Sequence, residues 1–383
     1  MHTPPFCPNP DCHHHHHHTR TRAEKARVGT WFWRKGLRYT ACAGSHQRYQ
    51  CIACKRFFTE RTFSIDYRVH RTVSYRDLIR DISSRVSLAA THRNRGISPA
   101  IRRNRVGRLA RNCIALHAEC RPYLTTPEDL IADGFVSFEV SQYYPCNLHI
   151  LIGKDSEYLF AMDHVTIRRT GRMSPRQKIR QAELEAVYRP APDGIITSFT
   201  RILHSMAWLV LQWEPEDPVQ LITDNKKEYP DAISRCEVAH QLLSEQSLGW
   251  RHISSNHHRG PGGPMFAMDN FDRELRKDIA AYVRETVTFR RNVQNAMESV
   301  QVYRMYHNFL KPYRVRGEAS AKRWQRAGLP AKLVKRRLKT LCVRRAFLSH
   351  YPDIPEEDLR VWKRHLYTPG QLKQQLPWQY IVA

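Results

Sequence analysis

The stretch Ile131-Ala-Asp-Gly-Phe-Val-Ser-Phe-Glu-Val140 marks the point where this 383-residue chain changes from helical to strand patterns. Apolar and polar residues alternate in its second half, as they do in a half-buried strand. Two further apolar runs follow, Leu148-His-Ile-Leu-Ile-Gly153 and Glu157-Tyr-Leu-Phe-Ala-Met162, with turn residues at 154–156. Short connections join antiparallel neighbours, so the sequence predicts three antiparallel strands.

Helices alternate with two more strands further along the chain. We expect helices over 175–188 and 194–210, and strands at Val219-Gln-Leu-Ile-Thr223 and Trp250-Arg-His-Ile-Ser254. Two long helices are expected over 268–284 and 292–310. This element order is that of a ribonuclease-H-like domain, an α/β fold in which helices flank a mixed sheet. We predict such a domain over 121–311, opening with a proline-containing linker.

This strand order would bring three acidic residues to one edge of the sheet. Asp133 opens the first strand, Asp224 ends the fourth, which neighbours the first in this fold, and Glu298 lies on a late helix. Three such carboxylates can hold two divalent cations about 3.5–4 Å apart, which activate a nucleophile and stabilise the leaving oxygen of a phosphodiester. Carboxylates are hard oxygen ligands, so Mg²⁺ or Mn²⁺ is the expected metal.

Other acids compete for these roles, and an Asp at a strand end is common. Glu139 shares the strand face of Asp133, but roughly 20 Å of extended strand separates the two. Glu274 and Glu285 compete with Glu298. We favour Glu298 because its helix carries apolar side chains that can pack on the sheet. They are Val293, Met297, Val300, Val302 and Tyr306.

The segment before the sheet has the pattern of a helix-turn-helix, which we expect over 71–120. Ser74-Tyr-Arg-Asp77 opens one helix as a variant of the capping box, and a second short helix is expected over 88–93. The stretch Asn94-Arg-Gly-Ile-Ser-Pro99 then supplies a turn glycine, an N-cap serine and a proline at the first helical position. A third helix should therefore run over 99–118.

This third helix is the predicted DNA-contacting element. A helix in the major groove uses arginines to reach phosphates and guanine edges. The residues that we expect to contact double-stranded DNA are Ser98, Arg102, Arg103, Arg105 and Arg108. An arginine-coated surface helix that links two domains would show the same pattern.

Four cysteines form two close pairs in the first part of the chain. Cys7-Pro-Asn-Pro-Asp-Cys12 and Cys51-Ile-Ala-Cys54 have the spacing of a zinc ribbon, in which two knuckles close a tetrahedral four-thiolate site. We therefore predict a structural Zn²⁺ in a module at 1–70. Because the first pair is wider than usual, two unrelated thiol pairs are the alternative. We expect Trp31, Trp33, Tyr49, Phe57 and Phe58 to cover the module. The run at 13–18, six histidines, is either a tag or a natural tract, and we assign it no role.

Composition favours a polyanionic partner. Lys and Arg number 62 against 36 Asp and Glu, and a formal charge of +26 would concentrate nucleic acid around the chain. Ten irregularly spaced cysteines do not resemble a disulfide framework, so we expect a reducing cytoplasm. The most apolar run, 199–213, is too short and polar to span a membrane. The basic tail at 312–383 is expected to be a helical arm for DNA or dimerisation, or a solvated charged helix.

These motifs, taken in order, resemble the DDE transposases of bacterial insertion sequences, and among them the insertion-sequence-one-like group. The ribbon ends in Cys51-Ile-Ala-Cys54-Lys-Arg-Phe-Phe, and Asp133-Gly-Phe-Val-Ser-Phe-Glu resembles the start of their catalytic domain. The block from Asp269 to Asn308 resembles the distal segment that bears the last Glu. In the nearest relatives that acid can sit a turn earlier, at the position of Gln294. The resemblance covers about residues 5–315.

The resemblance implies a transposase that binds the ends of its element. Such an enzyme hydrolyses a phosphodiester to free a 3′-hydroxyl, which then attacks target DNA. It would use Asp133, Asp224 and Glu298 as its triad and act as a homo-oligomer on DNA in the bacterial cytoplasm, with no membrane partner. The alternative is a DNA-binding regulator with a zinc ribbon, a helix-turn-helix and an inactive ribonuclease-H-like domain.

Overall fold

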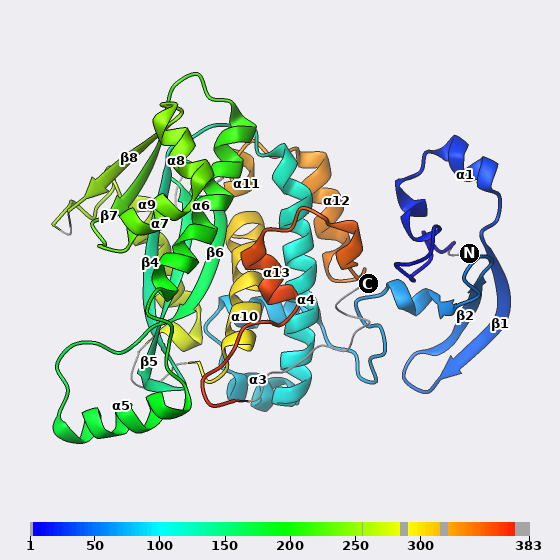
Figure 1. The fold of residues 1–383 in the computed structure, drawn as a ribbon. Helices are drawn as coiled ribbons and strands as arrows, with labels where there is room; N and C mark the ends of the chain where they lie inside the picture. Colours follow the sequence, from blue (N-terminus) through cyan, green and yellow to red (C-terminus); the bar gives the residue numbers. More distant parts are fainter. Residues whose placement is uncertain (1–2, 255, 284–289, 315–320, 372–383) are drawn as a thin grey trace.

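Two sheets of unequal size organise the chain (Figure 1). The computed structural model describes residues 3–254, 256–283, 290–314 and 321–371. The small N-terminal sheet has the order β1-β2-β3, and a five-stranded sheet has the order β6-β5-β4-β7-β8. The strands are β1 (Phe32–Thr40), β2 (Gly44–Cys51), β3 (Phe57–Thr59), β4 (Leu130–Glu139), β5 (Ser141–Gly153), β6 (Leu159–Thr166), β7 (Val219–Asp224) and β8 (Leu248–Ile253).

Helices precede, interrupt and follow the large sheet. The α-helices are α1 (Arg22–Val28), α2 (Tyr75–Ser83), α3 (Leu88–Arg95), α4 (Pro99–Cys120), α5 (Pro175–Val187), α6 (Gly194–Trp213), α7 (Tyr229–Arg235), α8 (Glu237–Ser244), α9 (Phe266–Asp278), α10 (Val293–Met305), α11 (Arg323–Arg326), α12 (Ala331–Leu341) and α13 (Glu356–Trp362). The shorter helical turns are η1 (His15–Thr19), η2 (Glu60–Phe63), η3 (Arg121–Tyr123), η4 (Ala280–Tyr282), the π-helical η5 (Tyr306–Leu310) and η6 (Leu348–His350).

The five-stranded sheet is mixed, as the sequence predicts. β4 pairs antiparallel with β5, and β5 with β6, whereas β7 lies parallel to both β4 and β8. Helices cover both faces of the sheet. On one face Ser198 of α6 bonds His149 of β5, and on the other Arg276 of α9 lies over Phe135 of β4.

The three helices of the predicted helix-turn-helix form where expected. Ser74, Ser87 and Ser98 each cap a helix by accepting a backbone N–H bond, and Gly96 closes α3 in the left-handed region at φ 60°. The third helix does not lie on the surface, however. α4 runs through the middle of the molecule, and its packing partners include α10 and α12.

One hydrophobic core extends from Ile65 to Leu366 and takes in the helix-turn-helix, the large sheet and the C-terminal helices. The predicted boundaries at 120 and 311 therefore do not separate different cores. The tail was expected to be an arm, but Trp324, Val334 and Trp362 are buried in this core. Its helix α12 is amphipathic, with apolar residues buried in the core and basic residues outside it, two of which pair with Glu119 of α4.

The ribbon has its own aromatic core. Trp31, Tyr49 and Phe58 are buried as predicted, and Phe347 from the C-terminal segment packs into the same cluster. Two predictions were wrong, because Trp33 and Phe57 are 44% and 51% exposed. They lie on the outer side of a thin sheet and stack instead with cations, Lys35 and Lys55 on Trp33 and Arg48 on Phe57.

One helix of the described chain, α6, is long and apolar enough to cross a membrane by length and composition alone. Half of its most apolar window is buried within the protein. It lies against β5, β6 and α7. These contacts are those of a core helix beside a sheet.

Candidate active site and zinc centre

The four predicted cysteines come together in the ribbon. Cys7 and Cys54 have their sulfur atoms 3.6 Å apart, and those of Cys12 and Cys51 are 3.7 Å apart. Zinc–sulfur bonds of about 2.3 Å in a tetrahedron place ligand sulfurs about 3.8 Å apart. Burial raises the pKa of the Cys12 thiol to about 11, so a bound cation would have to displace its proton. The cluster is compatible with a structural zinc site.

The histidine run beside this cluster is part of the fold. His15 is fully buried, with Nδ1 2.7 Å from the carbonyl oxygen of Cys7 and Nε2 2.5 Å from the hydroxyl of Ser349. Phe6 packs edge-on against His15 and against Phe347. The run therefore links the first cysteine knuckle to the C-terminal segment.

Asp133 and Asp224 are brought together at the edge where β4 and β7 run parallel. Ala132 pairs with Thr223, and the two acids are the next residues on the two strands. Burial, followed by the charge of Asp224, raises the pKa of Asp133 to about 6. The pKa of Asp224 is also raised, chiefly by burial, and Lys226 opposes this rise. Two acidic groups that resist ionisation side by side are a typical setting for a cation.

A third carboxyl at this edge comes from α9, not from α10. Asp272 has its pKa raised to about 8 by burial and then by the charges of Asp133 and Asp269, against the opposing charge of Arg276. Asp269 lies one helical turn before Asp272 and pairs with His257, whose Nε2 is 3.2 Å from its carboxylate. The sequence pointed to this helix through the competing acid Glu274 and through a family resemblance, but not to Asp272. The spacing of the two acids, i and i+3, was the available signal that both face one way.

Two of these carboxyls have buried oxygens without a partner in the described part of the chain, namely Oδ1 of Asp224 and Oδ1 of Asp272. A buried carboxylate oxygen that lacks a donor is costly unless a cation binds it. Within the described ranges, the acids at this edge do not form a group of three whose ligand atoms all lie within 4.8 Å of one another. The carboxyl oxygens at this edge are therefore farther apart than the ligand atoms that surround a single small ion.

Glu298, the predicted third acid, lies at a different interface. Its carboxylate is 3.5 Å from Nε of Arg364 and accepts a 3.2 Å bond from Gln294. A Cβ on Gly107 of α4 would lie 2.9 Å from it, so glycine permits the close approach of α4 and α10. The prediction went wrong because almost every residue of α10 is buried, so its apolar residues do not identify the face toward the sheet.

Gln294, the other candidate position on α10, is also held away from this edge. Its Nε2 donates to the carbonyl oxygen of Val361, at 2.8 Å, as well as to Glu298. Neither position on α10 supplies a free carboxylate near Asp133.

Glu139 is held in a separate buried group, so it does not compete with Asp133. Its carboxylate contacts His164 and accepts a 3.0 Å bond from Thr166. Glu139, Cys146 and His164 form the second group in the described chain whose ligand atoms all lie within 4.8 Å.

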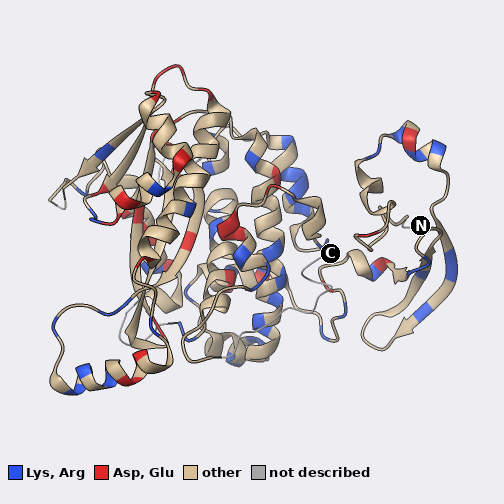
Figure 2. Cartoon of the chain, viewed as in Figure 1, with Lys and Arg blue, Asp and Glu red and all other residues tan. Residues whose placement is uncertain are grey.

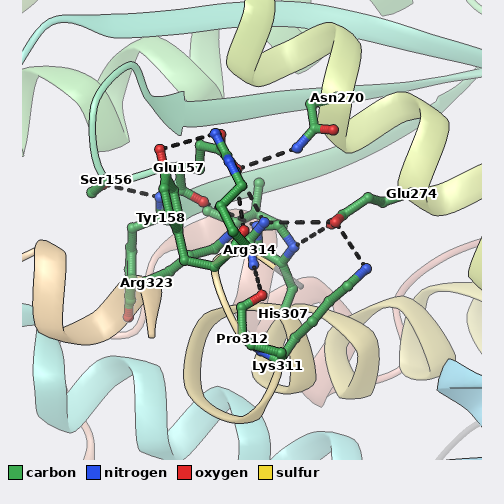
Figure 3. A network of polar contacts seen from close by, with 12 residues as sticks. Ser156, Glu157, Tyr158, Asn270, Glu274, His307, Lys311, Pro312, Arg314 and Arg323 are labelled. Atoms are coloured by element: carbon green, nitrogen blue, oxygen red, sulfur yellow. Dashed lines mark hydrogen bonds and ion pairs between the residues drawn. The ribbon is translucent and has the colours of Figure 1, made fainter. Parts of the chain in front are cut away.

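Glu274, another competitor, belongs to the polar network drawn in Figure 3. It lies 3.1 Å from Nδ1 of His307 and 3.0 Å from Nζ of Lys311. The same network pairs Arg323 with Glu157 at 3.0 Å. Despite burial, the hydrogen bond with His307 and the charges of Arg323 and Lys311 hold the pKa of Glu274 far below its usual range. The network fastens α9 to the π-helical end of α10. Glu285 lies outside the described residues.

The predicted DNA-contacting arginines are mostly inside the protein. Arg102, Arg105 and Arg108 are only 5–8% exposed. Arg105 donates to the carbonyl oxygen of Arg71, and Arg108 to that of Ile65, so both hold the segment that joins the ribbon to α2. The expectation that these three reach phosphates is wrong for this conformation, because α4 is a core helix. Ser98 is engaged as the helix cap.

Arg103 is the one predicted arginine whose side chain is exposed, and Arg93 on α3 is exposed near it in sequence. Basic residues also colour β1 and α12 in Figure 2. The ribbon strand β1 carries Arg34, Lys35 and Arg38, all exposed. The positive charge is thus available on the surface, although not where the arginine pattern of α4 predicted it.

No protein-family model matches the chain, and no curated protein matches it.

Proposed function

We propose that this protein is a metal-dependent DNA strand-cleaving and strand-transferring enzyme, a transposase of the DDE kind. The observation that carries the proposal is the convergence of Asp133, Asp224 and Asp272, which have raised pKa values and two orphaned buried oxygens. In this proposal Asp272 takes the place given to Glu298. The strand order and directions agree with a ribonuclease-H-like domain, which the proposal adopts.

The carboxyl donor set suits Mg²⁺ or Mn²⁺, and its spread suits cations that bridge protein and phosphate. Bound cations would supply Lewis-acid stabilisation of the phosphoryl oxygens and an activated hydroxyl nucleophile. Asp133 and Asp224 would bind the cations, and the paired strands that carry them fix the spacing of their carboxyl groups. Lys226, whose charge acts on both acids, would face the substrate phosphate. His257 would orient Asp269 through their contact.

Double-stranded DNA is the proposed partner, held by the net charge of +26 and by exposed basic residues such as Arg93, Arg103 and Lys35. Assembly as a homo-oligomer on DNA and action in the bacterial cytoplasm remain part of the proposal. The compact four-cysteine ribbon would hold a structural zinc beside the DNA-binding helices.

A second function is favoured by the position of Glu298. Glu298 is the acid of α10, and it is held by Arg364 and Gln294 away from Asp133. If activity requires a third acid from α10, the chain would be a DNA-binding regulator with an inactive site. Nicking of a supercoiled plasmid in Mg²⁺ or Mn²⁺ separates the two. The enzyme proposal expects nicking that Asp133→Asn or Asp224→Asn lowers by at least about 100-fold. Plasmid binding without metal-dependent nicking by the intact chain would favour the regulator.

A further inference from the structure

A cavity of about 410 Å³ lies between α2, α3 and the start of α4 on one side and η4 and the start of α10 on the other. Its walls are mainly apolar and include Ile82, Val86, Leu88, Ile279 and Ala296. The volume is in the range of cavities that bind small organic molecules.

Two arginines that line this cavity lack counter-charges within the described chain. Arg102 is 5% exposed, its Nε has no partner, and no ion pair or side-chain hydrogen bond from the described residues reaches its guanidinium. Arg290 also has a buried Nε without a partner there. The other contacts of its guanidinium group with described residues are a long 3.5 Å bond to Ser299 and the ring of Tyr282. The acid that acts electrostatically on Arg102 is Asp81, but Arg95 already holds Asp81 through two 2.9 Å bonds.

The charge of Arg290 also acts on Arg102. Burial, and next the charge of Arg290, lowers the pKa of Arg102 to about 10. Two buried like charges without an intervening anion are costly, and a bound oxyanion would satisfy both through charge-assisted hydrogen bonds. Arg103, Arg291 and Asn292 also line the cavity and add to its donor-rich end.

We propose that this cavity binds a small organic anion, with a carboxylate, sulfonate or phosphate group between Arg102 and Arg290 and an apolar body against Ile82, Val86 and Ile279. The proposal does not depend on the proposed enzyme activity, and its test uses neither DNA nor a divalent metal. A ligand there would contact residues of α2, α3 and α4, the three helices of the predicted DNA-binding segment. Its binding would therefore affect the positions of the exposed Arg93 and Arg103 on these helices.

The test uses the full chain and two fluorescent probes that share an apolar body, the anionic 8-anilino-1-naphthalenesulfonate and the neutral N-phenyl-1-naphthylamine. The proposal expects the anionic probe to bind saturably, one molecule per chain. Arg102→Met or Arg290→Met should weaken this binding by about tenfold or more. Arg27→Met, which changes an exposed arginine of α1 outside the cavity, should bind like the wild type. The neutral probe should be insensitive to Arg102→Met. Octanoate should compete with the anionic probe, and octanol should compete less.

Thermal melting provides a second measurement, which remains informative even if a methionine variant changes the stability of the fold. Without any probe, Arg102→Met should melt at a higher temperature than the wild type, because it removes an unpaired buried charge. Octanoate should raise the melting temperature of the wild type and leave that of Arg102→Met unchanged. Equal affinity of both probes for the wild type, or undiminished binding of the anionic probe to both methionine variants, would overturn the proposal.

Discussion

Asp272 on α9 faces Asp133 on β4 closely enough that the charge of Asp133 helps to raise the pKa of Asp272 to about 8. The two residues are far apart in sequence, and the packing of α9 on β4 brings them together. The third carboxyl group of the candidate active site therefore comes from α9 and not from α10.

The pH dependence of stability follows from these acids. Because the folded pKa of Asp272 is raised from its ordinary value to about 8, the folded protein binds a proton there more tightly than the unfolded chain. Without divalent metal, its contribution therefore lowers stability as pH rises through this window. Asp272→Asn should melt higher than the wild type at pH 8.5, and the difference should shrink at pH 5.5. A constant difference in melting temperature across this range would contradict the raised pKa.

Glu274 should show the opposite pH dependence. Its pKa is lowered, so its hydrogen bond with His307 and its ion pair with Lys311 stabilise the fold above the unfolded pKa and are lost as pH falls. Glu274→Gln should destabilise the chain by about 3 kcal/mol at pH 7, as expected when one partner of a buried charge network is removed. Chemical denaturation measures this loss. Unchanged stability, together with lost metal binding, would make Glu274 a metal ligand instead.

Much of the fold could be predicted from local patterns. The cysteine spacing, the capping serines at 74 and 98 and the five strands each depend on neighbouring residues, and each formed as expected. The site could be predicted only in part. Asp133 and Asp224 follow from strand order, whereas the third acid depends on which helix packs over β4. The burial of Arg102 likewise depends on how α2, η4 and the start of α10 pack around α4, which its own sequence does not reveal.

Zinc content can be tested on the full chain. We expect one zinc per chain, and Cys51→Ser should release it and unfold the ribbon, since a module of this size has too little core to fold without its metal. Elemental analysis after dialysis measures the metal. As a control, His13→Ala and His16→Ala should leave the tightly held zinc in place, because these side chains are exposed. Loss of all zinc in this control, with Cys51→Ser unaffected, would assign the metal to the histidine run.

DNA binding should depend on exposed rather than buried arginines. Replacing both Arg93 and Arg103 with Ala should weaken DNA binding and lower the salt slope by about 0.9 for each phosphate that is no longer neutralised. Arg105→Ala should instead lower the melting temperature, because Arg105 holds the backbone at Arg71. Fluorescence anisotropy over a range of salt concentrations measures the affinity and its salt slope. A smaller salt slope in Arg105→Ala than in the exposed pair would show that Arg105 reaches DNA after all.

Binding of Mn²⁺ to the zinc-loaded chain, measured by electron paramagnetic resonance, distinguishes the carboxylates of this edge from those of α10. We predict that Asp272→Asn weakens Mn²⁺ binding by at least about tenfold, as Asp133→Asn and Asp224→Asn should, because each removes a carboxylate donor. Glu298→Gln, which changes a carboxylate away from this edge, should bind Mn²⁺ like the wild type. Wild-type affinity in Asp272→Asn, with lost affinity in Glu298→Gln, would contradict a metal site built on Asp272.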